Sequence, residues 1–185
     1  MIAILIGAIA VLALLMLAWM FNGLVRARNQ CDSAWSQIDV QLKRRHDLIP
    51  NLIETVKGYA AHERGTFETV TQARANAIDA GQSGSPQQRG QAENVLTGAL
   101  KSLFAVAEAY PDLKANQNFS ALQEELTSTE DRVAYSRQFY NERVLGYNTR
   151  IQTFPRTLIA GPMHFRIREL FQSEPGAAAP VSVRF

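Results

Sequence analysis

The sequence predicts an all-α protein, in which an N-terminal transmembrane helix continues into an antiparallel, up-and-down bundle of four long helices, with a short C-terminal helix. Three observations support this fold class. The first 21 residues, MIAILIGAIAVLALLMLAWMF, contain no charged side chain. Apolar residues then recur at spacings of three, four and seven, which is typical of helices that bury one face. No stretch of useful length alternates as a strand would.

The apolar N-terminal run fits a membrane span, because about 20 helical residues cross the ~30 Å hydrocarbon core of a bilayer. Trp19 lies where an interfacial aromatic belt is expected, and Arg26 and Arg28 follow in the headgroup zone. A cleaved signal peptide is disfavoured, since no basic residues precede the run and no A-x-A site follows it. A lipoprotein is disfavoured because Cys31 follows polar residues, and a core helix rarely needs so long an apolar run. We predict a membrane anchor over residues 1–23.

The charges after this span predict its orientation. Arg26, Arg28, Lys43, Arg44 and Arg45 all follow the span, and the positive-inside rule then places the remainder of the chain in the cytoplasm. A periplasmic or extracellular location is the alternative, because large domains can be translocated whatever their charge. The predicted location is the cell membrane, with a single pass.

Proline, glycine and capping residues predict where the helices end. The membrane helix is expected to run on into the first bundle helix and to stop at a tight turn over residues 47–50, since Pro50 disfavours helix. A second helix is expected to fade into a loop at residues 81–86. Ser85, Pro86 and Gln88 form a strong start for a third helix, which Tyr110 and Pro111 end. The predicted apolar faces of these three helices comprise Leu24, Cys31, Trp35, Ile38 and Leu42; Leu52, Val56, Tyr59, Phe67, Val70 and Ala77; and Leu96, Leu100, Leu103, Val106 and Ala107.

The fourth predicted helix, over residues 117–153, has a seam of the coiled-coil or bundle type. Its seven-residue repeat is Phe119, Leu126, Val133, Tyr140, Tyr147 and Phe154, with Leu122, Val144 and Ile151 beside it. The pairs Tyr140-Asn141 and Tyr147-Asn148 are one heptad apart, and we interpret them as hydrogen-bonding residues that set helix register rather than as a ligand site.

Alternating helix directions predict which ends of the bundle meet. The turn at 47–50 and the loop at 110–116 should lie together at a membrane-distal tip, which makes a cluster there the candidate partner-contact surface. Its residues are Arg44, Arg45, His46, Asp47, Asp112 and Lys114. Capping of the negative end of the first helix by Arg44 and Arg45 is the competing explanation.

The C-terminal part of the chain is predicted to hold a short helix and a tail. A helix over residues 161–171 should place Met163, Ile167, Leu170 and Phe171 on one face, either against lipid or as a cap on the bundle. The bundle domain is assigned to residues 24–172 and a disordered tail to residues 173–185.

Little in the sequence points to chemistry. The net charge is +2 with no basic tract, so nucleic-acid binding is not expected. Cys31 is the single cysteine, which excludes an intrachain disulfide framework. No metal, nucleophile or phosphate-loop motif is present. If the protein is instead a metal-dependent hydrolase, its candidate site residues are His46, Asp47 and Glu54. We otherwise predict no catalytic residue, no metal and no cofactor, and a protein that is not an enzyme.

Three motifs nevertheless resemble one family. They are AWSQIDVQLKRRHDLIPNL at residues 34–52, AYPDLKANQNF at 109–119, and the YN…YN…FP ending of the last long helix. With their flanks, residues 28–77 and 92–160, they are similar to the LemA family. The resemblance implies a membrane-anchored antiparallel helical bundle in a bacterial inner membrane, with a loose association with envelope protein quality control. It implies no reaction, cofactor or catalytic residue.

The function expected from the sequence is therefore that of a membrane-anchored scaffold or adaptor. Its expected partners are membrane lipid and unidentified proteins. A self-associating membrane organiser, and hence a homo-oligomer, is the first alternative, and the metal-dependent hydrolase is the second.

Overall fold

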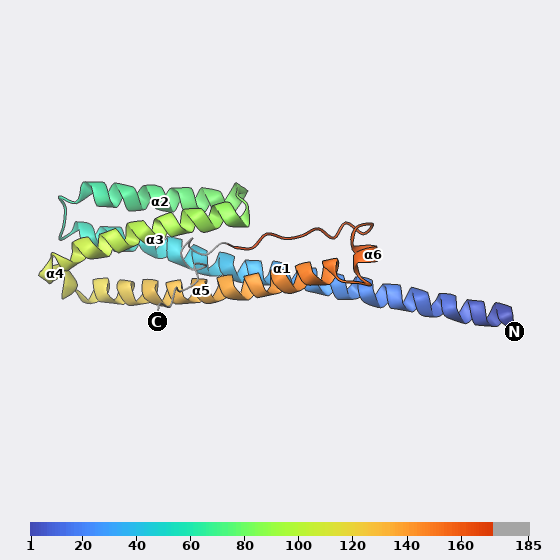
Figure 1. Cartoon of the computed structure of the whole chain (residues 1–185). Helices are drawn as coiled ribbons and strands as arrows, with labels where there is room; N and C mark the ends of the chain where they lie inside the picture. Colours follow the sequence, from blue (N-terminus) through green and yellow to red (C-terminus); the bar gives the residue numbers. More distant parts are fainter. Residues whose placement is uncertain (172–185) are drawn as a thin grey trace, which may run out of the picture. The chain divides into compact units, whose positions relative to one another are not determined.

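A computed structural model of the chain describes residues 1–171, and the predicted tail at 173–185 lies outside the described residues. The described part is all-α, as predicted, and contains no strand. Its helices are α1 (Ile2–Lys57), α2 (Arg64–Ser83), α3 (Pro86–Glu108), α4 (Pro111–Lys114), α5 (Gln117–Gln152) and α6 (Thr157–Ala160) (Figure 1).

The chain forms two compact units that divide α1 and α5 between them. The anchor unit comprises Met1–Ser36 and Gln138–Arg168. The bundle unit comprises Gln37–Arg137 and Glu169–Phe185, of which the structure describes the residues up to 171.

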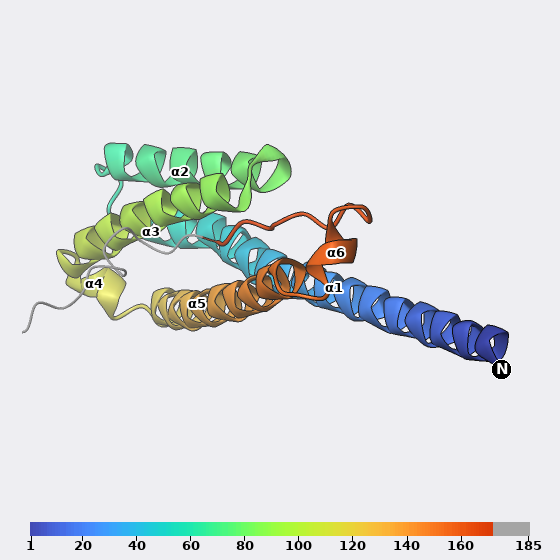
Figure 2. The same cartoon turned by 45° about the vertical axis from the view of Figure 1, so that its right-hand side comes forward.

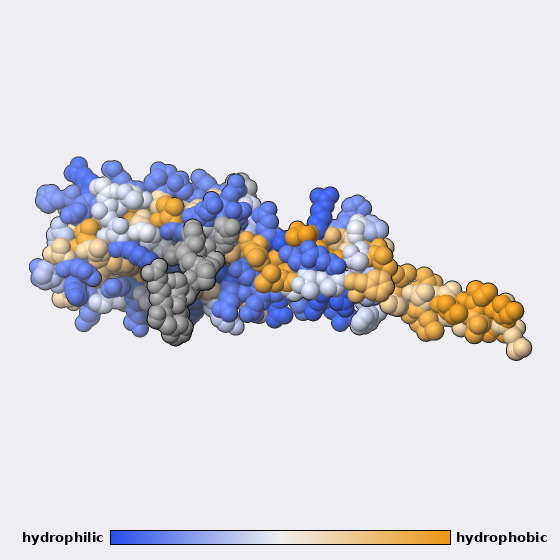
Figure 3. Space-filling view, viewed as in Figure 1, coloured by the Kyte–Doolittle hydropathy of each residue, from blue (hydrophilic) through white to orange (hydrophobic). Residues whose placement is uncertain are grey.

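In the anchor unit, α1 begins with a long apolar surface that nothing else in the described chain covers (Figure 3). By length and composition this helix can cross a membrane, which suggests a membrane anchor. Beyond this stretch, α1 and α5 bury complementary stripes at spacings of three and four, as in a coiled-coil seam. The stripes consist of Met20, Leu24, Ala27, Cys31 and Ala34 on α1 and Tyr140, Val144, Tyr147 and Ile151 on α5.

Trp35 contributes to this seam less than its sequence position predicts. Its ring lies 5.1 Å from the Tyr140 ring, so the apolar face predicted for this part of α1 does contact α5 at Trp35. The side chain is half-buried rather than fully buried. Truncation to alanine should therefore cost less than the several kcal/mol expected of a fully buried tryptophan.

In the bundle unit, four helical segments run up and down around one apolar core (Figures 1 and 2). α2 and α3 pack along each other, and the last part of α1 and the first part of α5 complete the bundle. The largest fully buried apolar residues of this core are Ile49, Leu52, Val56, Leu96, Leu103 and Leu113.

The cap at the start of α3 is confirmed. The Ser85 hydroxyl accepts from the Gln88 amide, and the Gln88 side chain accepts from the Ser85 amide, which completes a capping box with Pro86 at the first position. Gly84 makes the preceding turn possible, because a Cβ there would lie 2.5 Å from the Ala80 carbonyl oxygen. α2 therefore runs to Ser83, slightly beyond the predicted start of the loop.

The turn predicted at residues 47–50 is wrong. α1 continues through Pro50 to Lys57, the connection to α2 is residues 58–63, and Tyr59 lies in that connection, 42% exposed. A proline inside a helix leaves the carbonyl four residues earlier without its usual donor, and here that carbonyl belongs to His46. Arg74 of α2 supplies the missing donor, since its Nε lies 2.7 Å from the His46 carbonyl oxygen. The proline thus exposes a backbone acceptor through which α2 binds α1.

We expect Arg74→Met to destabilise the bundle unit by about 1–2 kcal/mol, because it leaves the His46 carbonyl without a donor. In a Pro50→Ala background the cost should be smaller, since that substitution restores a backbone N–H that can donate to the same carbonyl. A double-mutant cycle measured by urea unfolding of the full chain in mild detergent gives the coupling. An equal cost of Arg74→Met in both backgrounds would show that the two residues act independently.

Two expectations for the C-terminal part are also corrected. Phe154 is 78% exposed, because α5 ends at Gln152 and Phe154 no longer follows the helical seam. Residues 161–171 form turns and then an irregular segment instead of a helix, and the short helix is α6. The Asn148 side chain holds the irregular segment: its Nδ2 donates to the Arg168 carbonyl at 2.9 Å, and its Oδ1 accepts from the Arg168 amide at 3.0 Å. Asn148 therefore makes structural hydrogen bonds, but to an irregular segment and not to a neighbouring helix, so a role of the tyrosine–asparagine pairs in helix register stays a prediction.

Candidate functional site

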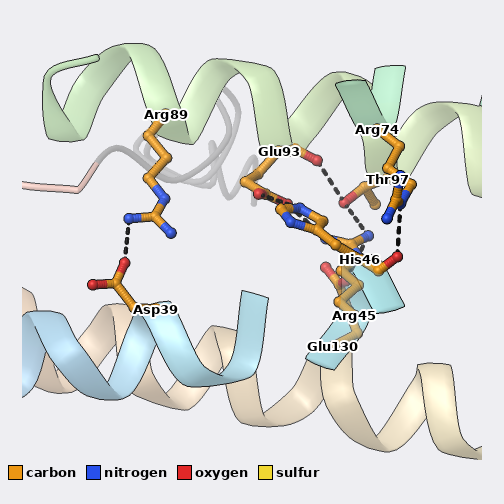
Figure 4. A network of polar contacts seen from close by, with 8 residues as sticks. All are labelled: Asp39, Arg45, His46, Arg74, Arg89, Glu93, Thr97 and Glu130. Carbon is orange, nitrogen blue, oxygen red and sulfur yellow. Dashed lines mark hydrogen bonds and ion pairs between the residues drawn. The ribbon is translucent and has the colours of Figure 1, made fainter. Parts of the chain in front are cut away.

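A buried cluster of charged side chains lies at the centre of the bundle unit (Figure 4). Glu93 of α3 is fully buried, and Arg45 and His46 of α1 are 2% and 7% exposed. His46 Nε2 lies 2.9 Å from Glu93 Oε1, and Arg45 Nη1 lies 3.5 Å from Glu93 Oε2. One carboxylate therefore faces two basic side chains from consecutive positions of α1.

Arg45 joins three helices. Its Nη2 donates to the Thr97 hydroxyl of α3 at 2.8 Å and lies 2.8 Å from Glu130 Oε2 of α5. Glu130 is more than a third exposed, so water screens this pair more than it screens the pair with Glu93. We call Arg45, His46, Glu93, Thr97 and Glu130 the ionic cluster. An ion pair between Arg89 of α3 and Asp39 of α1 adds a further connection between these two helices.

Burying charges costs free energy, and the ionic cluster offsets this cost by mutual pairing. Replacing Glu93 by an uncharged residue would leave the buried Arg45 and His46 without the carboxylate that both of them face. The cluster therefore makes the positions of α1, α3 and α5 depend on one another.

A cleft of about 170 Å³ opens beside the ionic cluster, lined by residues of α3 and α5 and by Arg45. Its apolar lining consists of Leu100, Phe104 and Leu126. Its polar lining consists of Arg45, Thr97, Lys101, Thr127, Glu130 and Asp131. Arg45, Thr97 and Glu130 thus belong to both the ionic cluster and the cleft.

A second, more polar hollow of about 420 Å³ lies on the side of the cluster nearer α2. The charged and imidazole groups of this hollow come from Asp39, Lys43, His46, Asp47 and Arg89. His46 therefore reaches both the ionic cluster and this hollow.

The structure places the predicted tip residues differently from the sequence prediction. Arg44 pairs with Glu125 of α5 at 2.5 Å, and Arg45 and His46 are buried in the ionic cluster. Asp112 and Lys114 lie on α4, and within the described residues neither pairs with residues 44–47. The predicted meeting of the two groups is wrong because α1 does not turn at Pro50.

The hydrolase alternative receives no support from these positions. Glu54 pairs with Lys57 at 3.1 Å instead of joining His46 and Asp47. In the part of the chain that the structure describes, no group of three or more His, Cys, Asp or Glu residues is placed to hold a metal ion.

Sequence reasoning missed Glu93 and Glu130, although the sequence carries a signal for each. Glu93 lies three and seven residues before Leu96 and Leu100, so it occupies the apolar stripe of its helix. Glu130 lies between Leu126 and Val133 on the seam of α5 in the same way. A charged residue in step with an apolar stripe indicates a buried or half-buried partner on another helix.

The ionic cluster, the cleft and the tyrosine–asparagine pairs all fall within residues 34–185, which match the model of the LemA family. The chain belongs to the LemA family. Among the proteins similar to this chain, magnetosome protein MamQ 1 of Paramagnetospirillum magneticum is 26% identical over 184 residues, covering 87% of this chain and 68% of the relative. Magnetosome protein MamQ of Magnetospirillum gryphiswaldense has the same identity and coverage. Protein LemA of Metamycoplasma hominis is 28% identical over 154 residues, covering 82% and 68%.

Proposed function

We propose that this LemA-family chain is a non-enzymatic, membrane-anchored scaffold, and that it binds a protein partner at the cleft between α3 and α5. The observation that carries the proposal is the pairing of an apolar cleft with the ionic cluster beneath it. Two of the charged side chains that line the cleft, Arg45 and Glu130, pair with each other. Leu100, Phe104 and Leu126 line a hollow of about 170 Å³.

The chemistry of the cleft fits one apolar anchor residue of a partner. A cavity of about 150 Å³ lined by apolar side chains can hold a benzene ring, so an aromatic or leucine side chain is a suitable occupant. Lys101 and Asp131 on the lining are exposed and can pair with charges of the partner around this anchor. An apolar pocket with a polar surround is the usual form of an interface hot spot.

The ionic cluster would keep this cleft in shape. Arg45 contacts both α3 and α5, the two helices that line the cleft. A site that is already ordered before binding loses less conformational entropy when the partner arrives. Rigid presentation of a surface is what a scaffold requires, and no reaction is needed.

The test uses a photo-reactive amino acid in place of Lys101, in the full chain within native membranes. We expect a discrete crosslinked species, and Thr127→Trp should abolish it because the indole fills the cleft. Thr69→Trp is the matched control: both threonines are exposed on helices and bond to the carbonyl four residues earlier, but Thr69 does not line the cleft.

Each outcome distinguishes one function. A crosslinked adduct between this chain and a different protein would support the scaffold function, provided that Thr127→Trp removes the adduct and Thr69→Trp preserves it. An adduct of twice the chain mass with the same dependence would instead support the self-associating organiser. No adduct, or one indifferent to Thr127→Trp, would remove the cleft as a partner site.

We also propose that the bundle unit faces the cytoplasm, in a single-pass protein of the cell membrane. Arg26 and Arg28 follow the apolar stretch of α1, and the positive-inside rule supports this side. A thiol introduced by Lys101→Cys at this exposed position should resist a membrane-impermeant thiol reagent until the cells are lysed. Labelling in intact cells would place the bundle unit outside.

A further inference from the structure

In the anchor unit, the chain that follows α5 folds against α1 where the apolar stretch of α1 ends (Figure 1). Phe165 makes an edge-on contact with Phe21, with ring centroids 5.7 Å apart. The Arg28 guanidinium lies 5.5 Å from the centre of the Phe165 ring, and the Arg156 guanidinium lies 5.6 Å from that of Trp19. We call residues 150–167, which comprise the end of α5 and the segment after it, the collar.

These contacts fix the depth of the collar relative to the anchor. Trp19 and Phe21 lie about 30 Å along α1 from its start, which is one hydrocarbon thickness. Tryptophan at this depth belongs to the aromatic belt of a membrane protein. The collar is therefore continuous with the anchor at the level of the lipid headgroups.

The collar exposes large apolar side chains that contribute nothing to a core. Phe154, Leu158, Met163 and Ile167 are 78%, 65%, 54% and 64% exposed. Such a group of side chains would be costly in water. Because these side chains lie beside the anchor helix, the outer part of the bilayer can cover them.

The charged residues in the segment from Arg143 to Arg168 have one sign. This segment contains five arginines and no aspartate or glutamate, and Arg28 of α1 contacts it at Phe165. Arg168 is paired with Asp32 of α1. Arg26, Arg150 and Arg166 are exposed, and none of them pairs with a carboxylate of the described chain. Exposed arginines beside exposed apolar side chains match an anionic membrane surface.

We propose that the collar is a lipid-binding surface, which inserts Phe154, Leu158 and Met163 into the bilayer interface and binds anionic phospholipid headgroups through Arg150 and Arg166. The anchor holds the chain in any bilayer, whereas the collar makes the association depend on lipid charge. This surface is separate from the cleft proposed to bind a protein, so either can fail without the other.

The first measurement compares two spin-labelled single-cysteine positions in the full chain, reconstituted alone into nanodiscs. Met163→Cys lies in the collar, and Leu145→Cys on α5 is its matched control, because both native side chains are 54% exposed in the anchor unit. Cys31 stays unlabelled, since it is buried and burial raises the pKa of its thiol, although Arg168 partly opposes this. We expect the Met163→Cys label to be accessible to oxygen and shielded from a water-soluble nickel relaxant, and the Leu145→Cys label to show the reverse. Equal exposure of both labels to the nickel relaxant would overturn the proposal.

The second measurement tests the headgroup charge. Two kinds of nanodisc are compared: discs of phosphatidylcholine alone, and discs of equal parts phosphatidylcholine and phosphatidylglycerol. The selectivity for phosphatidylglycerol over phosphatidylcholine is determined from the fraction of spin-labelled phosphatidylglycerol whose motion the protein restricts. Replacing Arg150 and Arg166 together by glutamine should lower this selectivity about five-fold for each arginine. The control replaces Arg64 and Arg132, two exposed arginines of the bundle unit, and so changes the net charge equally.

The proposal is supported if the collar variant loses its selectivity for phosphatidylglycerol and the control variant keeps it. An equal loss in both variants would overturn it in favour of a response to net charge alone. Absence of any selectivity for phosphatidylglycerol in the unmodified chain would overturn the assignment of an anionic headgroup.

Discussion

Replacing Glu93 by leucine is expected to lower the free energy of unfolding by about 3–5 kcal/mol. The carboxylate is fully buried and faces both His46 at 2.9 Å and Arg45 at 3.5 Å. Its removal leaves the buried Arg45 with Thr97 as a neutral acceptor and with Glu130, whose side chain is partly in water, as its paired carboxylate. The measurement is urea unfolding of the full chain in mild detergent, followed by helical circular dichroism.

Two further variants make this expectation specific to the charge. Glu124→Leu removes an exposed glutamate of α5 and should change stability by no more than about 0.5 kcal/mol. Adding Arg45→Met to Glu93→Leu should recover much of the loss, because a buried pair can often be replaced by apolar residues at little cost. If the double variant is as unstable as the sum of the single variants, the charges act independently and the ionic cluster is not a unit.

Replacing Phe171 by alanine is expected to destabilise the bundle unit by about 3–5 kcal/mol. Phe171 is 0% exposed although it lies in an irregular segment, and the Arg137 guanidinium of α5 lies 4.9 Å from the centre of its ring. The truncation removes both the buried apolar area and this cation–π contact.

The neighbouring residue provides the control for Phe171. Leu170 is 39% exposed, so Leu170→Ala should cost less than about 1 kcal/mol in the same unfolding experiment. A similar small effect for both substitutions would mean that the segment after Arg168 does not pack on the bundle unit in solution.

The sequence predicted those features whose signals are local. The long apolar start of α1, a candidate membrane helix, follows from an uncharged run of the right length. The start of α3 follows from Ser85, Pro86 and Gln88 within one helical turn. The seam of α5 follows from a seven-residue repeat, and most of its members, such as Val133 and Tyr147, are buried. Phe154 is exposed although it belongs to this repeat, because α5 ends before the repeat does.

The candidate site was predictable only in part. His46 and Arg45 stood out as polar residues near a proline, but the sequence could not show that both are buried against Glu93. Their spacing along the chain, 47 and 48 residues from Glu93, carries no information about distance until the helices are packed. The cleft likewise exists only where Leu100 and Leu126, on different helices, line the same hollow.

The sequence by itself determined that this protein is helical, that it begins with an anchor-like helix, and which face of most helices is buried, because these properties depend on residues within a few turns of one another. Only the tertiary structure decided the role of Pro50. By local preference a proline ends a helix, whereas here Arg74 supplies a donor to the carbonyl that the proline leaves free, and α1 continues. The same holds for Glu93 and for Asn148, whose partners lie on other segments of the chain. Long-range pairing of polar groups satisfies the carbonyl that Pro50 leaves free and decides which charges become buried, and one residue's neighbours in sequence cannot reveal its neighbours in space.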